Sequence, residues 1–273
     1  MIDLGVARAV AVAAAEAAGK VIAEGVRGPY RIHAKGRDGD VVTDLDHQAE
    51  KVIKERLLEA YPGHAILAEE SGLSAGPGDL LWVVDPLDGT NNLAIGLPAY
   101  SVGVALCSGG LPLVGVIHDP VSGQTWSAVR DGGAQGPGLV RECVHTGRPP
   151  VLSWVQGYPV LLEDPVALAY KLMLGVRCRR LLQLWAPQLT WVMLARGLID
   201  GIVGYRTGSV DLPAGALLAQ ECGIEFRALD GGPFEIRVTD EDEHSFLAAR
   251  SEMIGPLLEL LRTAEGIVLP VIP

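Results

Sequence analysis

The chain has 273 residues, 49% hydrophobic and 20% charged, so we expect a globular protein of one large or two smaller domains, not a disordered or coiled-coil one. Its formal net charge of −11 would repel a nucleic-acid backbone, which argues against binding to a nucleic-acid polymer. A phosphorylated small molecule remains compatible with this charge if a cation lies between the substrate and the carboxylates.

We expect neither a secretion signal nor a membrane segment. Charged residues interrupt the Ala/Val-rich beginning of the chain. The uncharged stretch Gly89–Ile117 contains Pro98 and Pro112, and we interpret it as a loop, a helix start and core strands. The four cysteines lie far apart and form no CxxC pair, which favours a cytoplasmic location over an oxidising compartment.

The N-terminal part of the chain predicts two helices followed by a sheet. Apolar residues from Leu4 to Val21 recur at spacings of three and four, which predicts a helix over about 4–25. After a turn-rich segment around residues 36–40, Thr43 or Asp44 can cap a second helix that ends at Tyr61. Short apolar runs then predict an antiparallel meander: Ala65–Ala68, Leu80–Val84, Tyr100–Leu106, Leu113–His118 and Thr125–Val129.

Beyond a Gly/Pro-rich stretch from Gly132 to Pro150, strands and helices alternate, which is typical of an α/β arrangement. We therefore place a boundary near residue 140, between an N-terminal α+β half (1–140) and a C-terminal α/β half (141–273). The predicted strands are Val151–Val155, Arg179–Leu184, Leu198–Gly204, Ile224–Ala228 and Ser245–Ala249; the predicted helices are Pro165–Leu174, Pro187–Arg196, Asp211–Glu221 and about 252–264.

The densest chemical signal is the segment Trp82–Asn92, in which an apolar strand ends in Asp85 and Asp88. Pro86 bends the chain directly after Asp85, so both carboxylates and the carbonyl group of Leu87 can converge on one point. Such a set of hard oxygen donors suits Mg²⁺. The alternative is an Asp-rich turn in which Asp88 caps the helix that follows.

That next helix is short and begins at Gly89 and Thr90. The N–H groups at a helix start have no partner within the helix, so they are suited to binding phosphate oxygens. The sequence therefore predicts a phosphate site directly beside the candidate metal site.

Three other acidic segments can lie near this strand end. Glu69 and Glu70 follow the strand Ala65–Ala68, so two strands deliver acids to one edge of the sheet. The segment Asp40–Asp46 places acids around a helix start, and Asp211 precedes another helix. The alternatives are a solvated turn for the first segment and helix capping for the other two.

Five segments, in this order, resemble the inositol monophosphatase family over nearly the whole chain. They are Asp40–Asp46, Ala68–Gly72, Trp82–Asn92, Ala195–Asp200 and Val210–Gly215. The resemblance implies a layered αβαβα sandwich of the inositol monophosphatase and fructose-1,6-bisphosphatase type. It also implies a Mg²⁺-dependent, Li⁺-sensitive phosphomonoesterase, commonly a homodimer, with two or three Mg²⁺ ions and Mn²⁺ as a substitute.

The resemblance also implies the metal ligands. Carried over by position, Glu69, Asp85 and the carbonyl group of Leu87 would hold a first cation, and Asp85, Asp88 and Asp211 a second, so that Asp85 bridges the two. Two neighbouring cations can activate water and neutralise charge on the leaving oxygen of a phosphate ester.

The resemblance implies catalytic and phosphate-binding residues as well. Glu69 and Thr90, with Asp46 behind Thr90, would orient the attacking water and help to deprotonate it. The N–H groups of Gly89 and Thr90 would hold phosphate oxygens.

Several segments depart from the family pattern without removing an expected ligand. Val210 and Pro213 stand where the family has Trp and Ala, and Leu184–Gln188 replaces a Gly/Ser-rich helix start. These changes alter the walls around the leaving group, so metal-dependent chemistry is a better-supported prediction than specificity for inositol.

The loop around residues 204–208 lacks the acidic residue that inositol-type enzymes place there. We expect Tyr205, Arg206 and Ser209 to line the substrate wall, with Arg206 or Tyr205 facing a second anion or a base. An exposed structural arginine is the alternative. The predicted function is hydrolysis of a small cyclitol, sugar, histidinol or nucleotide phosphate; the alternative is a catalytically weak family member that acts as a binding or assembly partner.

Overall fold

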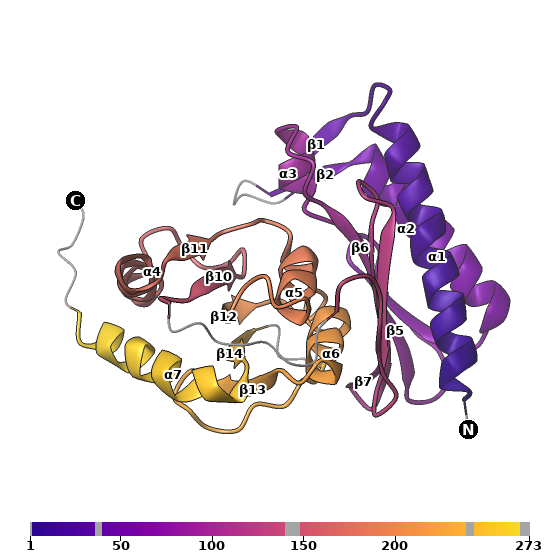
Figure 1. Cartoon of the computed structure of the whole chain (residues 1–273). Helices are drawn as coiled ribbons and strands as arrows, with labels where there is room; N and C mark the ends of the chain where they lie inside the picture. Colours follow the sequence, from indigo (N-terminus) through magenta and orange to yellow (C-terminus); the bar gives the residue numbers. More distant parts are fainter. Residues whose placement is uncertain (1, 36–39, 140–147, 239–242, 268–273) are drawn as a thin grey trace.

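Two β-sheets alternate with three layers of helices, in the order helix, sheet, helix, sheet, helix (Figure 1). The computed structural model describes residues 2–35, 40–139, 148–238 and 243–267. The predicted αβαβα sandwich is confirmed. The helices of the described residues are α1 (Leu4–Gly25), α2 (Asp44–Ala60), α3 (Thr90–Ala94), α4 (Pro165–Arg177), α5 (Pro187–Ala195), α6 (Pro213–Glu221) and α7 (Ser251–Glu265).

The larger sheet has the strand order β4-β3-β5-β6-β7-β8-β9. Helices α1 and α2 cover one face, and α5 and α6 cover the other (Figure 1). Its strands are β3 (Ala65–Ala68), β4 (Gly72–Ser74), β5 (Leu80–Asp88), β6 (Ser101–Ser108), β7 (Leu111–Asp119), β8 (Gln124–Val129) and β9 (Gly133–Gln135).

The predicted antiparallel meander is correct from β5 to β8 but wrong for β3 and β5, which pair in parallel, and it missed β9, which pairs with β8. The cause is β4, a short strand that the sequence analysis missed. It folds back along the outer edge of β3, so the chain returns to the other side of β3 running in the original direction. The carboxyl ends of β3 and β5 therefore meet at one edge of the sheet.

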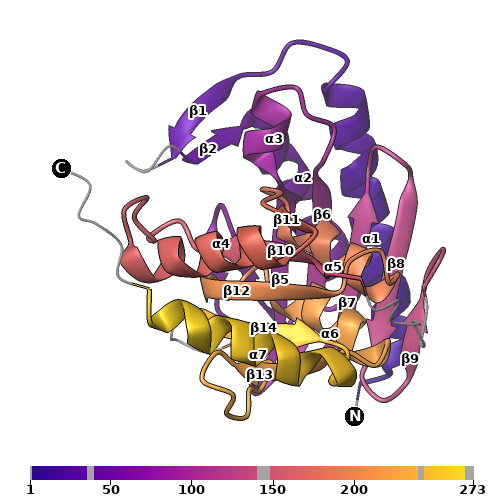
Figure 2. The ribbon, with the colours of Figure 1, turned by 60° about the vertical axis from the view of Figure 1, so that its left-hand side comes forward.

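The smaller sheet has the order β11-β10-β12-β14-β13, in which β10 runs parallel to β11 and β12. Figure 2 shows α4 and α7 side by side on its outer face. Its strands are β10 (Val151–Gln156), β11 (Arg180–Leu182), β12 (Gly201–Thr207), β13 (Glu225–Ala228) and β14 (His244–Ala249).

Some predicted element boundaries need correction. The strand expected at Leu198–Gly204 runs from Gly201 to Thr207, and the helix expected from Asp211 begins at Pro213. The sequence analysis also missed a hairpin of β1 (Ile32–Lys35) and β2 (Asp40–Thr43), in which only Thr43 is buried, so the strands lack the apolar alternation of a core strand. Residues 36–39 of the predicted turn lie outside the described residues.

One hydrophobic core spans both predicted halves of the chain. Val83 and Ile117 of the larger sheet, Trp191 and Leu217 of the middle helices, and Phe246 of the smaller sheet belong to the same buried cluster. The predicted boundary near residue 140 lies outside the described residues, and the division into halves stays a prediction. No helix within the described parts of the chain is long and apolar enough to cross a membrane.

Candidate active site

Asp85 is the centre of the acidic site, and the sheet register places it there. Glu69 follows β3 directly, and its N–H group donates to the carbonyl oxygen of Val84 at 3.1 Å, which holds Glu69 beside the end of β5. Asp85 is buried, and neither of its carboxylate oxygens has a hydrogen-bond donor among the described residues. Burial raises the pKa of Asp85 well above its usual range, and the neighbouring carboxylates, first that of Glu69, raise it further.

Asp88 lies on the same strand beyond a break in the ladder. Pro86 lacks an N–H group, and the register of β5 against β6 shifts between Asp85 and Asp88. One oxygen of Asp88, Oδ2, accepts from the hydroxyl of Ser101 at 2.9 Å and from the N–H group of Gln188 at 2.8 Å. We expected Pro86 to bend the chain directly after Asp85. Instead, the chain continues as a strand to Asp88.

The capping alternatives for Asp88 and Asp211 are wrong. Gly89, with a left-handed φ of 95°, is the N-cap of α3, and Leu212 is the N-cap of α6; neither helix has a side-chain cap. Burial and the charge of Glu69 raise the pKa of Asp211 to about 7, and burial with the charge of Asp211 raises the pKa of Asp88. Each of these acids raises the pKa of another, which indicates that they lie near one another; they are called the acidic cluster below.

Asp46 combines the two roles that the sequence analysis treated as alternatives. Its Oδ2 accepts from the N–H group of Thr43 at 2.8 Å, which forms the capping box of α2. Its Oδ1 lies 2.7 Å from the hydroxyl of Thr90, which lies 2.8 Å from the carbonyl oxygen of Leu87. A fully buried carboxylate therefore holds Thr90 at the start of α3.

Lys35 is a site residue that the sequence analysis missed. Its Nζ donates to Glu69 Oε1 at 2.7 Å and to Glu70 Oε1 at 2.8 Å. Burial alone would lower the pKa of Lys35, but the two carboxylates outweigh it and hold the pKa above its usual value. The signal that could have found Lys35 is the pair of basic residues Lys35 and Arg37 directly ahead of a run of acids.

The oxygen-rich cluster fits a hard divalent cation. Its oxygen atoms belong to carboxylates, and two buried oxygens of Asp85 have no hydrogen-bond donor among the described residues. As the side chains stand, no three His, Cys, Asp or Glu residues in the described part of the chain are arranged to hold an ion, and the ammonium group of Lys35 lies at Glu69.

The residues expected to form the substrate wall have other partners. The guanidinium group of Arg206 binds Glu243 through two contacts of 2.6 and 2.8 Å, at a backbone φ of 49°. The ring of Tyr205 stacks on Trp154, and Ser209 Oγ lies 3.0 Å from a ring nitrogen of His244. No contact of the described residues joins these three side chains to the carboxylate cluster.

Tyr158 is better placed beside the site than Arg206, and the sequence analysis did not identify it. Its hydroxyl lies 3.1 Å from Nδ2 of Asn91, which lies 3.3 Å from Oδ1 of Asp40. It is 55% exposed and links the loop after β10 to α3, so a residue of the C-terminal part contacts the helix that follows Asp88.

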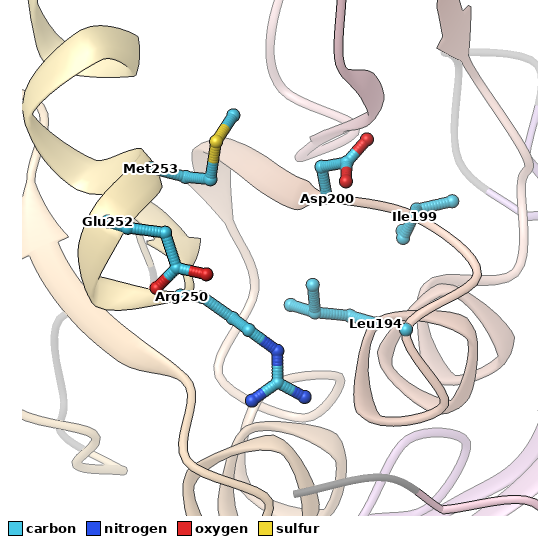
Figure 3. A pocket seen from close by; sticks show the side chains of 7 residues that line it. Leu194, Ile199, Asp200, Arg250, Glu252 and Met253 are labelled. Carbon is cyan, nitrogen blue, oxygen red and sulfur yellow. The ribbon is translucent and has the colours of Figure 1, made fainter. Parts of the chain in front are cut away.

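A small pocket shown in Figure 3 lies elsewhere, at the carboxyl end of α5. Its volume of about 20 Å³ holds roughly one water molecule. Leu194, Asp200 and Arg250 are among its lining residues, whereas the carboxylate cluster contacts α5 at its amino end, through Gln188. This pocket is too small and too distant along α5 to be part of the acidic site.

The chain is similar to known proteins over most of its length. The profile of the inositol monophosphatase family matches residues 3–262. Nus factor SuhB of Salmonella typhimurium is 34% identical over 231 residues, which cover 82% of this chain and 85% of that protein.

Two solved structures share the fold closely. The extragenic suppressor protein suhB from Bartonella henselae superposes with a TM-score of 0.82 and 26% identity, over 94% of this chain and 98% of that one. The inositol monophosphatase from Anabaena superposes with a TM-score of 0.80 and 26% identity, over 99% of each chain.

Proposed function

The chain belongs to the inositol monophosphatase family, and from this membership we propose that it is a Mg²⁺-dependent phosphomonoesterase of a small phosphorylated metabolite. The observation that carries the proposal is the pair of buried Asp85 oxygens that have no donor, in a cluster with Glu69, Asp88 and Asp211. Buried carboxylates in mutual repulsion destabilise a fold, and a bound cation is the partner that relieves this repulsion.

The donor set supports two cation positions. Glu69, Asp85 and the carbonyl group of Leu87 would hold one ion, and Asp85, Asp88 and Asp211 the other. Oxygen ligands of this kind suit Mg²⁺, with Mn²⁺ as a substitute. When bound, the cations would lower the pKa of a water molecule and place positive charge opposite the phosphate oxygens.

The residues of the chain position the reactants around this charge. Asp46 holds the Thr90 hydroxyl at the start of α3, which supports a role for Thr90, together with Glu69, in orienting a water molecule. Glu69 is the group that accepts the proton of that water. The N–H groups of Gly89 and Thr90 bind phosphate oxygens. Gly89 is required there because a Cβ atom would lie 2.7 Å from the carbonyl oxygen of Ala99.

The substrate wall determines which ester is preferred. The ion pair of Arg206 with Glu243 favours Tyr158 over Arg206 as the side chain that meets the leaving group. The loop around residues 204–208 has no acidic residue, which supports a substrate other than inositol phosphate, among sugar, histidinol and nucleotide phosphates.

Phosphate release tests the proposal. We would measure it with Mg²⁺, with EDTA and with added Li⁺, on inositol 1-phosphate, fructose 1,6-bisphosphate, histidinol phosphate, NADP and 3′-phosphoadenosine 5′-phosphate. We expect Mg²⁺-dependent release from at least one ester, inhibited by Li⁺. Release that EDTA leaves unchanged would contradict the role of the cations.

A second candidate function has one observation in its favour, namely that similar curated proteins bear the name Nus factor SuhB. In that case the chain is a catalytically weak family member that acts as a binding or assembly partner. Mg²⁺ would then raise the melting temperature without phosphate release from any ester of the panel. Rapid turnover of one ester would contradict this second candidate.

A further inference from the structure

Gln188, the second residue of α5, touches both acids that are expected to hold the second cation. It is fully buried. Its backbone N–H group donates to Asp88 Oδ2 at 2.8 Å, and its side-chain Nε2 donates to the carbonyl oxygen of Asp211 at 3.2 Å. A carbonyl oxygen only accepts, so the NH₂ end of the amide faces Asp211 and the orientation of the amide is determined.

The other end of the amide, Oε1, has no hydrogen-bond partner among the described residues. Five buried side-chain atoms in the described part of the chain lack a partner, and three of them are Gln188 Oε1 and the two carboxylate oxygens of Asp85. All three are acceptors, so none can satisfy another. A buried acceptor of this kind destabilises the fold unless a donor or a cation supplies the missing positive partner.

The β5–β6 ladder places Gln188 beside Asp85. Gly103 lies directly opposite Asp85, and residues directly opposite in an antiparallel pair project from the same face of the sheet. A Cβ atom on Gly103 would lie 2.8 Å from Nε2 and 3.0 Å from Cδ of Gln188. The amide therefore fills the space above Gly103, on the face where Asp85 projects.

We propose that Oε1 of Gln188 is an additional, neutral oxygen ligand of the cation site formed with Asp85, Asp88 and Asp211. The inference rests on the proposed function, because it assumes that a cation binds there. A carboxamide oxygen suits Mg²⁺ or Mn²⁺, and it adds a donor without adding to the repulsion among the carboxylates. The C-terminal part of the chain then contributes two ligands, Asp211 and Gln188.

The test is metal binding by the Gln188→Met variant. Methionine has nearly the same shape and keeps the backbone N–H group that donates to Asp88, but it lacks the amide oxygen. We would titrate metal-free protein with Mn²⁺ and with Mg²⁺ by calorimetry, and record melting temperatures without metal. We expect affinity to fall about tenfold or more, with an unchanged or higher metal-free melting temperature. Affinity within twofold of the parent overturns the proposal.

Two reference variants make the result specific. Ser153→Ala removes another buried orphan oxygen, in β10, and leaves metal affinity unchanged. Asp85→Asn abolishes binding if the metal site exists. If Asp85→Asn keeps its affinity, the proposed function fails; if it loses affinity while Gln188→Met does not, only the inference about Gln188 fails.

A structural bridge gives a different pattern. If Gln188 only links α5 to Asp211, the metal-free melting temperature of Gln188→Met falls and the metal affinity does not, which overturns the proposal. Should Gln188→Met fail to fold, Gln188→Asn withdraws the same amide by one methylene group and keeps its polarity. We expect it to lose metal affinity as well, and retained affinity overturns the proposal.

Discussion

At the scale of single residues, the properties of the Asp85 carboxylate depend on residues that are distant in the sequence and close in space. An Asp at the end of a strand is unremarkable in water, where an unpaired carboxylate is well solvated. Here the parallel pairing of β3 and β5 brings Glu69 beside it, and the packing of α5 removes water from both of its oxygens. The same residue therefore destabilises the metal-free fold and prepares a site for a cation.

Asp85→Asn separates these two effects. We expect phosphate release to fall by about 10²-fold or more, because the bridging charge is lost. We expect the metal-free melting temperature to rise, by roughly 2–4 °C for each kcal/mol of relieved repulsion, because a neutral amide brings two donors to a place that holds only acceptors. Steady-state kinetics and thermal melting in EDTA measure the two effects, and unchanged turnover would contradict the bridging role.

At the scale of elements, α5 and α6 connect the core to the site. They lie between the two sheets, and the N-terminal end of each helix faces the acidic cluster, through Gln188 and the segment after Asp211. Gly215 of α6 lets this packing occur: a Cβ atom there would lie 2.1 Å from Cδ1 of the buried Trp191 in α5. The positions of Asp211 and Gln188, which we propose as cation ligands, thus depend on a glycine that is not itself a proposed ligand.

Gly215→Ala and Gly175→Ala form a matched pair. We expect Gly215→Ala to destabilise the protein by about 1–3 kcal/mol, because Trp191 must move within a packed core. Gly175 lies in α4 with nothing within 4 Å of a Cβ atom, so Gly175→Ala should stabilise by about 0.4–1 kcal/mol through a less flexible unfolded chain. Urea unfolding midpoints compare the two; equal shifts of the same sign would contradict the packing argument.

At the scale of the whole molecule, the fold places a few of the 33 acidic residues where their pKa is raised. The formal net charge is −11, and the carboxyl groups of Asp85, Asp88 and Asp211 all have a raised pKa. In the unfolded chain the pKa of these carboxyl groups is near 4, and in the folded chain it is higher. At pH values between the two, the folded state binds more protons than the unfolded state, so stability falls as the pH rises. Burial lowers the pKa of His118 from its ordinary value of 6.5. At pH values below 6.5 this shift makes stability rise with pH, which opposes the effect of the carboxyl groups.

The pH dependence of melting therefore reports on the site. In EDTA we expect the melting temperature of the parent protein to fall between pH 6.5 and 8, the range in which Asp211, with a pKa of about 7, loses its proton. Mg²⁺ should remove this fall, because deprotonated carboxylates bind the cation more tightly. Asp85→Asn is the control, because we expect its melting temperature in EDTA to fall less over the same pH range. A melting temperature that rises over this range in EDTA would contradict the assignment.

The sequence by itself determined most elements and the identity of the acids. The Leu4–Val21 periodicity predicts α1, and the strand ends at Ala68 and Val84 predict where Glu69 and Asp85 lie, because both features depend on side chains close together in the chain. The family was recognised from the resemblance of five ordered segments, above all Ala68–Gly72 and Trp82–Asn92. The β1–β2 hairpin, by contrast, lacks an apolar pattern and was missed.

Only the tertiary structure decided which distant residues meet. The capping alternatives for Asp88 and Asp211 were open in the sequence, because an acid before a helix has the same local pattern whether it caps or not. The contact of Gln188 with Asp88, one hundred residues away, and the ion pair of Lys35 with Glu69 depend on how whole layers pack. Such contacts form when buried faces come together, and no local periodicity encodes them.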